Sequence, residues 1–269
     1  MSVLEPIDKQ EFLARHPWAR KPPKIVYEDE RIVAVNKPPG WLSIPDRWNP
    51  AHPNIYHFLL KKYGKIYIVH RLDWQTSGVN VFAKDAETHR MLNIAFERRK
   101  VVKEYHAIVE GIPEKESDRI ELPLSPLSSR KRNVYKVDRV EGKPAITEYV
   151  VAKKWIGYSF LKVFPITGRP HQIRVHMKAI GTPIVGDVTY GGHYLYLSRL
   201  KPTFKRKRSL DYEEKPIIER SALHAYKLTI PKDESGEETI ELTAPYFKDM
   251  KVAIKYLDLY RPWVEEEID

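Results

Sequence analysis

The residues best suited to chemistry are concentrated in a ten-residue stretch from His70 to Val79, HRLDWQTSGV. It combines a carboxylate, a guanidinium, an imidazole, two hydroxyls and a glycine between two apolar runs, 66–69 and 79–83. Both runs predict strands, so the polar stretch is a loop held on a rigid sheet, where catalytic residues tend to lie. Asp73, two residues from Arg71, is either half of a structural ion pair or a positioned nucleophile or base.

A second polar cluster occupies residues 164–176, FPITGRPHQIRVH, with two arginines, two histidines and a glutamine. If this segment is a strand, Gln172, Arg174 and His176 share one face, and the two apolar residues between them share the other. A row of hydrogen-bond donors along one face of a strand suits a binding site better than a core. The segment therefore predicts a strand that lines a site.

Five motifs occur in the order and spacing of a known family. They are HRLDWQTSGV, KEYHAIVEG, TGRPHQIRVHM, PIVGDVTYGG and LHAYKL, within a match that runs from about Lys24 to about Tyr246. Several separated motifs in the right order are more specific than one short pattern. On these motifs the chain resembles the RluA-type pseudouridine synthases, which implies an isomerase that converts uridine in RNA to pseudouridine. The resemblance also implies an α+β fold, a large mixed and mostly antiparallel sheet flanked by helices and loops, with a catalytic cleft across its middle.

The resemblance assigns the essential carboxylate to Asp73, which either attacks covalently or stabilises and deprotonates an intermediate. Arg174 matches the family's arginine that pairs with this aspartate, and such a cation would offset the rise in carboxyl pKa that burial alone causes. Tyr105 matches the family's active-site tyrosine, which lies against the uracil ring and could assist proton transfer from C5. Without the resemblance, Tyr105 would be an ordinary half-buried strand tyrosine.

Four further residues are expected at the substrate. The target uridine must leave its helix or loop, and contacts with the base must offset the few kcal/mol that unstacking costs. Arg71 could fill the space that the base vacates or hold a phosphate. Ile173 could form the apolar wall under the uracil, pack in the core, or do both. Arg169 and His171 complete the expected substrate-binding set.

The charge balance favours a polyanionic partner. The chain has 46 Lys and Arg against 36 Asp and Glu, a net charge of +10. Such a balance is typical of proteins that bind nucleic acid or an anionic membrane surface, although it can also serve solubility alone. The first 23 residues are too few for the S4-type RNA-binding domain of many family members, so we expect RNA binding by the catalytic domain itself. The expected partner is tRNA or ribosomal RNA, with a slight preference for tRNA or a short stem-loop. The expected phosphate-contacting residues are Arg130, Lys131, Arg132, Lys205, Arg206, Lys207 and Arg208.

Several kinds of site are excluded or disfavoured. The chain has no cysteine, which excludes disulfides, thiolate metal sites and cysteine nucleophiles. No run approaches the ~18 apolar residues of a membrane span, and the N-terminus lacks the apolar region of a secretory signal. His171 and His176 have no clear third ligand, so we expect no metal. The isomerisation transfers no electrons, so no cofactor is expected either. We expect a cytoplasmic protein.

The chain is expected to comprise an N-terminal extension, 1–23, and one catalytic domain, 24–269, that acts as a monomer. Hydrophobic periodicity and capping residues predict the main elements. These are a hairpin over 25–35, a helix over 86–99 capped by Asp85, a strand over 101–109, a strand pair over 145–152 and 159–165, and a helix over 245–258. Residues 113–135 are expected to be rich in loops.

Three positions depart from the family pattern, Trp74, Pro170 and Val188. They affect substrate contacts and loop conformation but remove no expected catalytic group. Two other function classes are weighed against the synthase. An RNA-binding or RNA-folding factor without turnover would have no reason to keep all three expected catalytic residues. A glycosidase or DNA glycosylase would usually need a second placed carboxylate, and the loop at 70–79 offers only Asp73.

Overall fold

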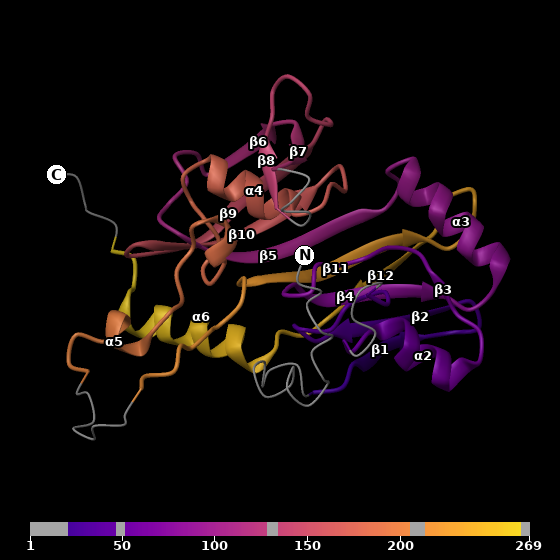
Figure 1. Cartoon of the computed structure of the whole chain (residues 1–269), viewed down its shortest axis with the longest axis horizontal. Coiled ribbons are helices and arrows are strands. Elements are labelled where there is room, and N and C mark those ends of the chain that lie inside the picture. Colours follow the sequence, from indigo (N-terminus) through magenta and orange to yellow (C-terminus); the bar gives the residue numbers. More distant parts are fainter. Residues whose placement is uncertain (1–20, 47–51, 128–133, 205–212, 265–269) are drawn as a thin grey trace, which may run out of the picture. The chain divides into compact units, whose positions relative to one another are not determined.

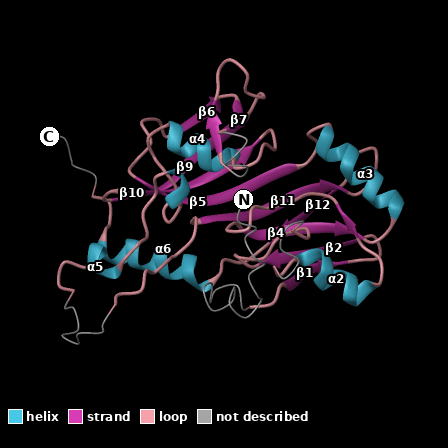
Figure 2. Ribbon diagram, in the orientation of Figure 1, coloured by secondary structure: helices cyan, strands magenta, loops and turns pink. Residues whose placement is uncertain are grey.

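The computed structural model describes residues 21–46, 52–127, 134–204 and 213–264. The predicted fold class is confirmed, because the described chain is a mixed α+β structure with few helices and a large, mostly antiparallel sheet (Figure 2). The chain divides into two compact units. Unit 1 comprises Met1–Glu104 and His224–Pro245, and unit 2 comprises Tyr105–Leu223 and Tyr246–Asp269. The single catalytic domain over 24–269 stays a prediction.

Unit 1 is built on strands in the order β1-β2-β4-β11, with β3 beside β4 and β12 beside β11 (Figure 1). Its elements are β1 (Lys24–Glu28), β2 (Ile32–Lys37), α2 (Ile55–Tyr63), β3 (Tyr67–Ile68), β4 (Ser77–Ala83), α3 (Ala86–Glu97), most of β11 (Leu223–Pro231) and β12 (Thr239–Thr243). The predicted hairpin is confirmed as β1 and β2, whose turn is fixed by Asp29. The Asp29 carboxylate accepts hydrogen bonds from the backbone N–H groups of Arg31 and Ile32, at 2.8 and 2.7 Å.

Strand β2 is buried at every position because both of its faces are covered. Ile32 and Ala34 pack with α3, and Val33 and Val35 pack with α2. Side chains alternate between the two faces of a strand, so one short apolar run serves two cores. Strand β4 is buried in the same way, so the loop that leads into it ends on a rigid layer of the sheet.

Helix α3 confirms the helix predicted after Asp85. The Asp85 carboxylate accepts from the backbone N–H of Thr88 at 2.8 Å, which satisfies one of the free donors of the first turn. Met91, Leu92 and Ala95, at helical spacing, place their side chains in the core with β2 and β4.

Unit 2 is built on the antiparallel strands β5-β10-β9-β6, with a separate two-stranded sheet of β7 and β8. Its elements are most of β5 (Val102–Glu110), β6 (Ser117–Glu121), β7 (Leu124–Pro126), β8 (Tyr135–Val137), β9 (Ile146–Trp155), β10 (Tyr158–Pro165), α4 (Gln172–Ala179), η2 (Val188–Tyr190), α5 (Leu197–Leu200) and α6 (Lys248–Tyr260). The predicted strand over 101–109, the predicted strand pair and the predicted C-terminal helix are confirmed as β5, β9 with β10, and α6. Strands β6 and β7 lie in the region 113–135, where the sequence predicts loops.

The prediction of a strand over 172–176 is wrong, because these residues form the first part of helix α4. The apolar alternation arises because the helix is buried on two sides. Ile173 and Met177, one turn apart, pack in the main core of unit 2, whereas Val175 packs in a second cluster with Leu124 and Tyr190. Successive residues in a helix differ by about 100°, so the polar side chains between them share no single face.

Candidate active site

The expected catalytic carboxylate lies in the loop between β3 and β4 of unit 1. Asp73 is partly buried, and its carbonyl accepts from the N–H of Thr76 at 3.1 Å, which closes a tight turn. Leu72, immediately before it, is buried, and its N–H donates to the Ser43 hydroxyl at 2.9 Å. Arg71 is exposed. The loop therefore presents a guanidinium to solvent and holds the carboxylate at the edge of a packed layer.

A buried ammonium joins this loop to the end of β2. Lys37 has no exposed surface, and its Nζ donates to the carbonyls of Pro38, Trp41 and Trp74, at 3.1, 2.7 and 3.4 Å. The Trp74 carbonyl also accepts from the N–H of Gly40, at 2.6 Å. Because the Lys37 ammonium binds carbonyls from two loops, it holds in place the carbonyl of Trp74, the residue that directly follows Asp73.

The histidine at the start of the motif is a structural acceptor. Nε2 of His70 accepts from the N–H of Val81 at 3.1 Å, and its ring stacks on Phe96 with centroids 5.1 Å apart. Burial, reinforced by the nearby positive charge of Lys103, lowers the pKa of His70 to about 3. The imidazole is therefore neutral near pH 7 and holds the loop to β4 without adding charge to it.

The other end of the loop is tied to β11. His224 and Ser77 are neighbours in the parallel pairing of β11 with β4, and the Ser77 hydroxyl lies 2.8 Å from Nδ1 of His224. Nε2 of His224 lies 3.0 Å from the carbonyl of Ala244, which can only accept, so Nε2 carries the proton and Nδ1 accepts from Ser77. The hydroxyl of Ser77 is thus engaged in a structural bond.

The expected partner of Asp73, Arg174, lies in α4 of unit 2 and is buried. Its Nε donates to Asp187 Oδ2 at 2.6 Å and its Nη2 to Oδ1 at 2.8 Å, a bidentate pair. The guanidinium also lies over the ring of Tyr190, 4.8 Å from its centroid. Two rigid neighbours therefore fix the plane of the guanidinium.

Tyr190 links this pair to the start of α4. Its hydroxyl accepts from the N–H of Tyr135 at 2.9 Å and lies 2.7 Å from Nδ1 of His171. His171 precedes the first residue of α4 in the left-handed backbone conformation, with a φ of 55°. A histidine in that conformation is uncommon, and its ring is held in place by Tyr190.

The turn before α4 is anchored by Gln172. The Gln172 amide donates to the carbonyl of Ile146 at 2.8 Å, and its oxygen accepts from the N–H of Arg169 at 3.0 Å. The Arg169 guanidinium donates to the Pro144 carbonyl, so part of its bonding capacity is structural. Gln172 therefore serves to position the turn rather than to line a row of donors.

Of the two remaining expected residues, Tyr105 packs against the unit 2 core and Ile173 lies within it. Tyr105 is partly buried in β5, paired with Val163 of β10. Ile173 has 6% of its surface exposed and packs in the core, which bears out the core alternative without excluding contact with a base.

The expected site residues are divided between the units. Arg71 and Asp73 belong to unit 1, and Tyr105, Arg169, His171, Ile173 and Arg174 belong to unit 2, where α4 and the turn before it bring the last four together. The ion pair of Asp73 with Arg174 stays a prediction. The expected phosphate contacts at 130–132 and 205–208 lie outside the described residues, as does most of the extension 1–23.

Three residues that position the site were missed as such by reasoning from the sequence. Asp187 and Tyr190 lie in the motif PIVGDVTYGG, and Lys37 lies in the NKPPG segment. An aspartate just after an apolar run and a lysine at the end of one were the available signals, because charges seldom occupy such positions without a partner. The partner itself could not be read from the spacing.

Two observations concern membranes and metals. No helix in the described parts of the chain is long and apolar enough to cross a bilayer. Among the described residues, no three or more His, Asp or Glu side chains are grouped as metal ligands.

Comparison with known proteins places these features in a family. Residues 31–179 match the family model described as RNA pseudouridylate synthase. The dual-specificity RNA pseudouridine synthase RluA of Vibrio parahaemolyticus is 42% identical over 251 residues, which cover 91% of this chain and 96% of that protein. The ribosomal large subunit pseudouridine synthase D of Haemophilus influenzae is 35% identical, covering 87% of this chain and 70% of the relative. A solved structure, human RNA pseudouridylate synthase domain containing 1, superposes with a TM-score of 0.63 at 26% identity and covers 84% of each chain.

Proposed function

The chain belongs to the RNA pseudouridylate synthase family, in its RluA type, and from this premise we propose how its residues isomerise uridine in RNA. The observation that carries the proposal is the way the loop of Asp73 is held on both sides. Before Asp73, the N–H of the buried Leu72 donates to Ser43. After it, the carbonyl of Trp74 accepts from the buried Lys37. A catalytic group works best on a loop that its neighbours have already fixed.

The reaction conserves atoms and electrons. The N1–C1′ bond of uridine breaks, the uracil turns, and a C5–C1′ bond forms. The proton on C5 then leaves and N1 ends protonated, so no oxidant is required. Asp73 supplies the carboxylate, either by attacking covalently or by stabilising the intermediate and removing a proton. The two routes share the requirement that Asp73 be ionised beside the sugar.

Arg174 is proposed to pair with Asp73 and keep it ionised. Its orientation by Asp187 and Tyr190 supports this role, since a guanidinium held in one plane offers its remaining edge in a fixed direction. Tyr105 is proposed to lie against the uracil ring and to assist the C5 proton. Arg71, Arg169, His171 and Ile173 are proposed to hold the flipped nucleotide, with Ile173 as the apolar surface.

The proposed substrate is a uridine in tRNA or ribosomal RNA. The names of the relatives include a dual-specificity RNA synthase and a ribosomal large subunit synthase, and both RNA classes are therefore candidates. We propose a monomer that works in the cytoplasm without a cofactor or metal, and that uses 130–132 and 205–208 as phosphate contacts.

Tritium release from 5-tritiated uridine in total tRNA and in ribosomal RNA tests the proposal. Wild type should release tritium from at least one RNA, and Asp73→Ala should release none. Asp118→Ala, which removes a partly exposed carboxylate of β6, is the matched control and should retain wild-type release. Release by Asp73→Ala at the wild-type rate would contradict the catalytic role.

Two further variants separate the roles of the partners. Arg174→Ala should lower kcat far more than it weakens RNA binding, and equal losses would argue against its pairing with Asp73. Tyr105→Phe should lose turnover if the hydroxyl moves a proton, whereas retained turnover would limit Tyr105 to stacking.

A further inference from the structure

Helix α6 (Figure 1) belongs to unit 2, and its exposed face carries three lysines. Lys248, Lys251 and Lys255 are all exposed. At about 100° per residue they fall within roughly 60° of arc, and they span about 10 Å along the helix axis. The opposite face buries Met250, Ala253 and Leu257 in the core. We call the three lysines the α6 stripe.

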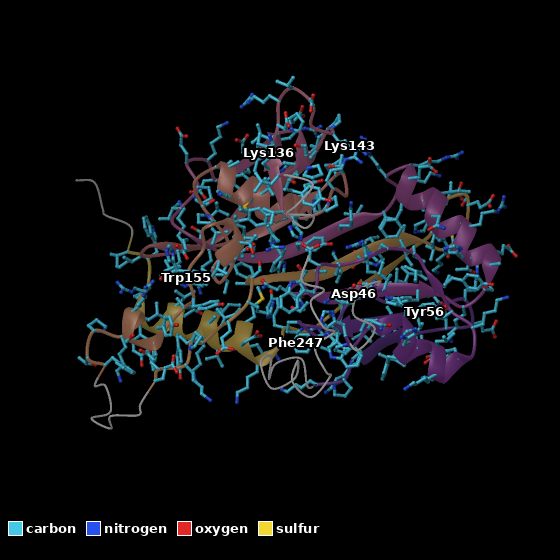
Figure 3. All side chains as sticks on the ribbon, viewed as in Figure 1. Asp46, Tyr56, Lys136, Lys143, Trp155 and Phe247 are labelled. Atoms are coloured by element: carbon cyan, nitrogen blue, oxygen red, sulfur yellow. The ribbon has the colours of Figure 1, made fainter. Side chains whose placement is uncertain are left out.

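The acidic residues of α6 do not neutralise this stripe. The Asp249 carboxylate binds the buried guanidinium of Arg220, with its Oδ2 2.7 Å from Nε. Asp258, at the other end of the helix, accepts from Trp155 Nε1 at 2.7 Å and pairs with Lys153 at 2.7 Å. The side chain of Trp155 is labelled in Figure 3. Among the described residues, no carboxylate lies within ion-pair distance of the stripe.

Three other exposed or partly exposed lysines of unit 2 do have carboxylate partners. Lys115 pairs with Asp118 and Lys136 with Asp138, at 3.1 and 3.4 Å, and Lys154 pairs with Glu116. Lys248 and Lys251 also lie in the first turn of α6, where the helix dipole disfavours cations. Neither pairing with the described carboxylates nor helix stability accounts for the stripe, and an external polyanion offers it partners of opposite charge.

We propose that the α6 stripe binds phosphates of the substrate RNA; this rests on the proposed function, which makes RNA the substrate. The stripe, about 10 Å long, matches three steps of about 3.4 Å between successive phosphates on one strand of a duplex, and so spans four phosphates. Three point charges without a bidentate or planar group suit backbone contacts and carry no base specificity. The stripe therefore contributes affinity and orientation but takes no part in the chemistry.

The test compares two triple variants of the full chain with equal loss of charge. One is Lys248→Gln/Lys251→Gln/Lys255→Gln, and the control is Lys115→Gln/Lys136→Gln/Lys154→Gln (Figure 3 labels Lys136). Binding of fluorescein-labelled unfractionated tRNA is measured by anisotropy from about 0.05 to 0.3 M KCl. Each lost phosphate contact reduces the slope of log K against log salt by about 0.7–0.9. The stripe variant should therefore lose about 2 from that slope and weaken Kd at least tenfold at about 0.15 M salt, and the control should lose less than about 1.

Acetylation provides a second readout that does not depend on the variants folding. Wild-type protein is treated with an amine-acetylating ester with and without the tRNA, and each lysine is quantified by mass spectrometry. The stripe lysines should be protected by RNA, and the control lysines should not.

Several outcomes overturn the proposal. Equal slopes of log K against log salt for the two variants would show that the stripe lysines contact water rather than RNA. Equal acetylation of the stripe lysines with and without RNA would show the same. Unchanged tRNA binding together with lost binding to vesicles rich in phosphatidylserine would assign the stripe to a membrane surface. Failure of the proposed function is a separate result. It would appear as absent tritium release by the wild-type protein, whereas the stripe is tested by tRNA binding and by the salt dependence of that binding.

Discussion

Arg174 and Asp187 form a buried bidentate ion pair, thirteen residues apart in the chain, in which only 3% and 1% of the respective side chains are exposed. Two charges so far from water are stable only together, and the pair fixes the orientation of the arginine. Arg174, which the resemblance predicts to be catalytic, is thus held by Asp187, to which the sequence analysis assigns no role.

Removal of Asp187 should destabilise the protein strongly. Asp187→Ala takes the bidentate partner from a buried guanidinium, and breaking such a pair costs about 3–5 kcal/mol of unfolding free energy. Urea denaturation measures the loss. Glu148→Ala, which breaks an exposed pair with Arg119, is the control and should cost less than about 1 kcal/mol. Equal losses in the two variants would show that Arg174 does not depend on Asp187.

Lys37→Met should impair both stability and turnover. The substitution keeps the length of the side chain but removes the donor that holds three carbonyls, and a hydrogen bond to a charged group contributes about 1.5–3 kcal/mol. We expect a loss of about 3 kcal/mol and, because Trp74 follows Asp73, a kcat reduced at least tenfold with RNA affinity kept. Lys62→Met, on the exposed side of α2, is the control for loss of a lysine. A wild-type kcat for Lys37→Met at saturating RNA would show that the loop keeps its geometry without the ammonium.

The sequence predicts those parts of the fold that depend on neighbours within a few residues. The hairpin of β1 and β2 follows from two apolar runs and an acidic turn, and α3 follows from Asp85 and three apolar residues at helical spacing. In each case the local pattern and the final packing agree. The family motifs identify the function for the same reason, since they are contiguous stretches.

Features that depend on distant segments were not predictable in this way. The sequence of helix α4 wrongly predicts a strand, because a helix packed on two sides shows the apolar alternation of a strand. The pairing of Arg174 with Asp187 depends on the path of the chain after α4. His224 and Ser77 are 147 residues apart, and nothing in either motif indicates that β11 lies parallel to β4.

Gly78→Ala should be among the most damaging substitutions in unit 1. Gly78 has a φ of 120°, and a Cβ there would lie 2.1 Å from the carbonyl oxygen of Ala225 in the neighbouring strand. Strands β4 and β11 would have to separate where they hold the loop of Asp73, and we expect a loss above about 4 kcal/mol. Gly157→Ala is the control, because its φ is 80° but no atom lies within 4 Å of the added Cβ. It should cost only the conformational strain, about 1–2 kcal/mol. Similar melting temperatures for the two variants would show that the strands can part without cost.

His70 should make the protein less stable as the pH falls. Its pKa is about 3 in the folded protein and near 6.5 in the unfolded chain, so below about pH 6.5 the unfolded chain binds a proton that the native protein does not. Stability therefore rises with pH over this window, and as the pH falls towards 3 it decreases by up to about 1.4 kcal/mol per unit. His176, whose pKa burial also lowers, adds in the same direction.

His70→Gln isolates this contribution. Glutamine can accept the Val81 N–H as Nε2 does, but it does not titrate, so the slope of unfolding free energy against pH between 6 and 4 should fall by about 1.4 kcal/mol per unit. Urea denaturation at half-unit steps of pH measures both proteins. An unchanged slope in His70→Gln would mean that the imidazole takes up its proton in the folded protein, and that the loop of Asp73 carries an additional positive charge in acid.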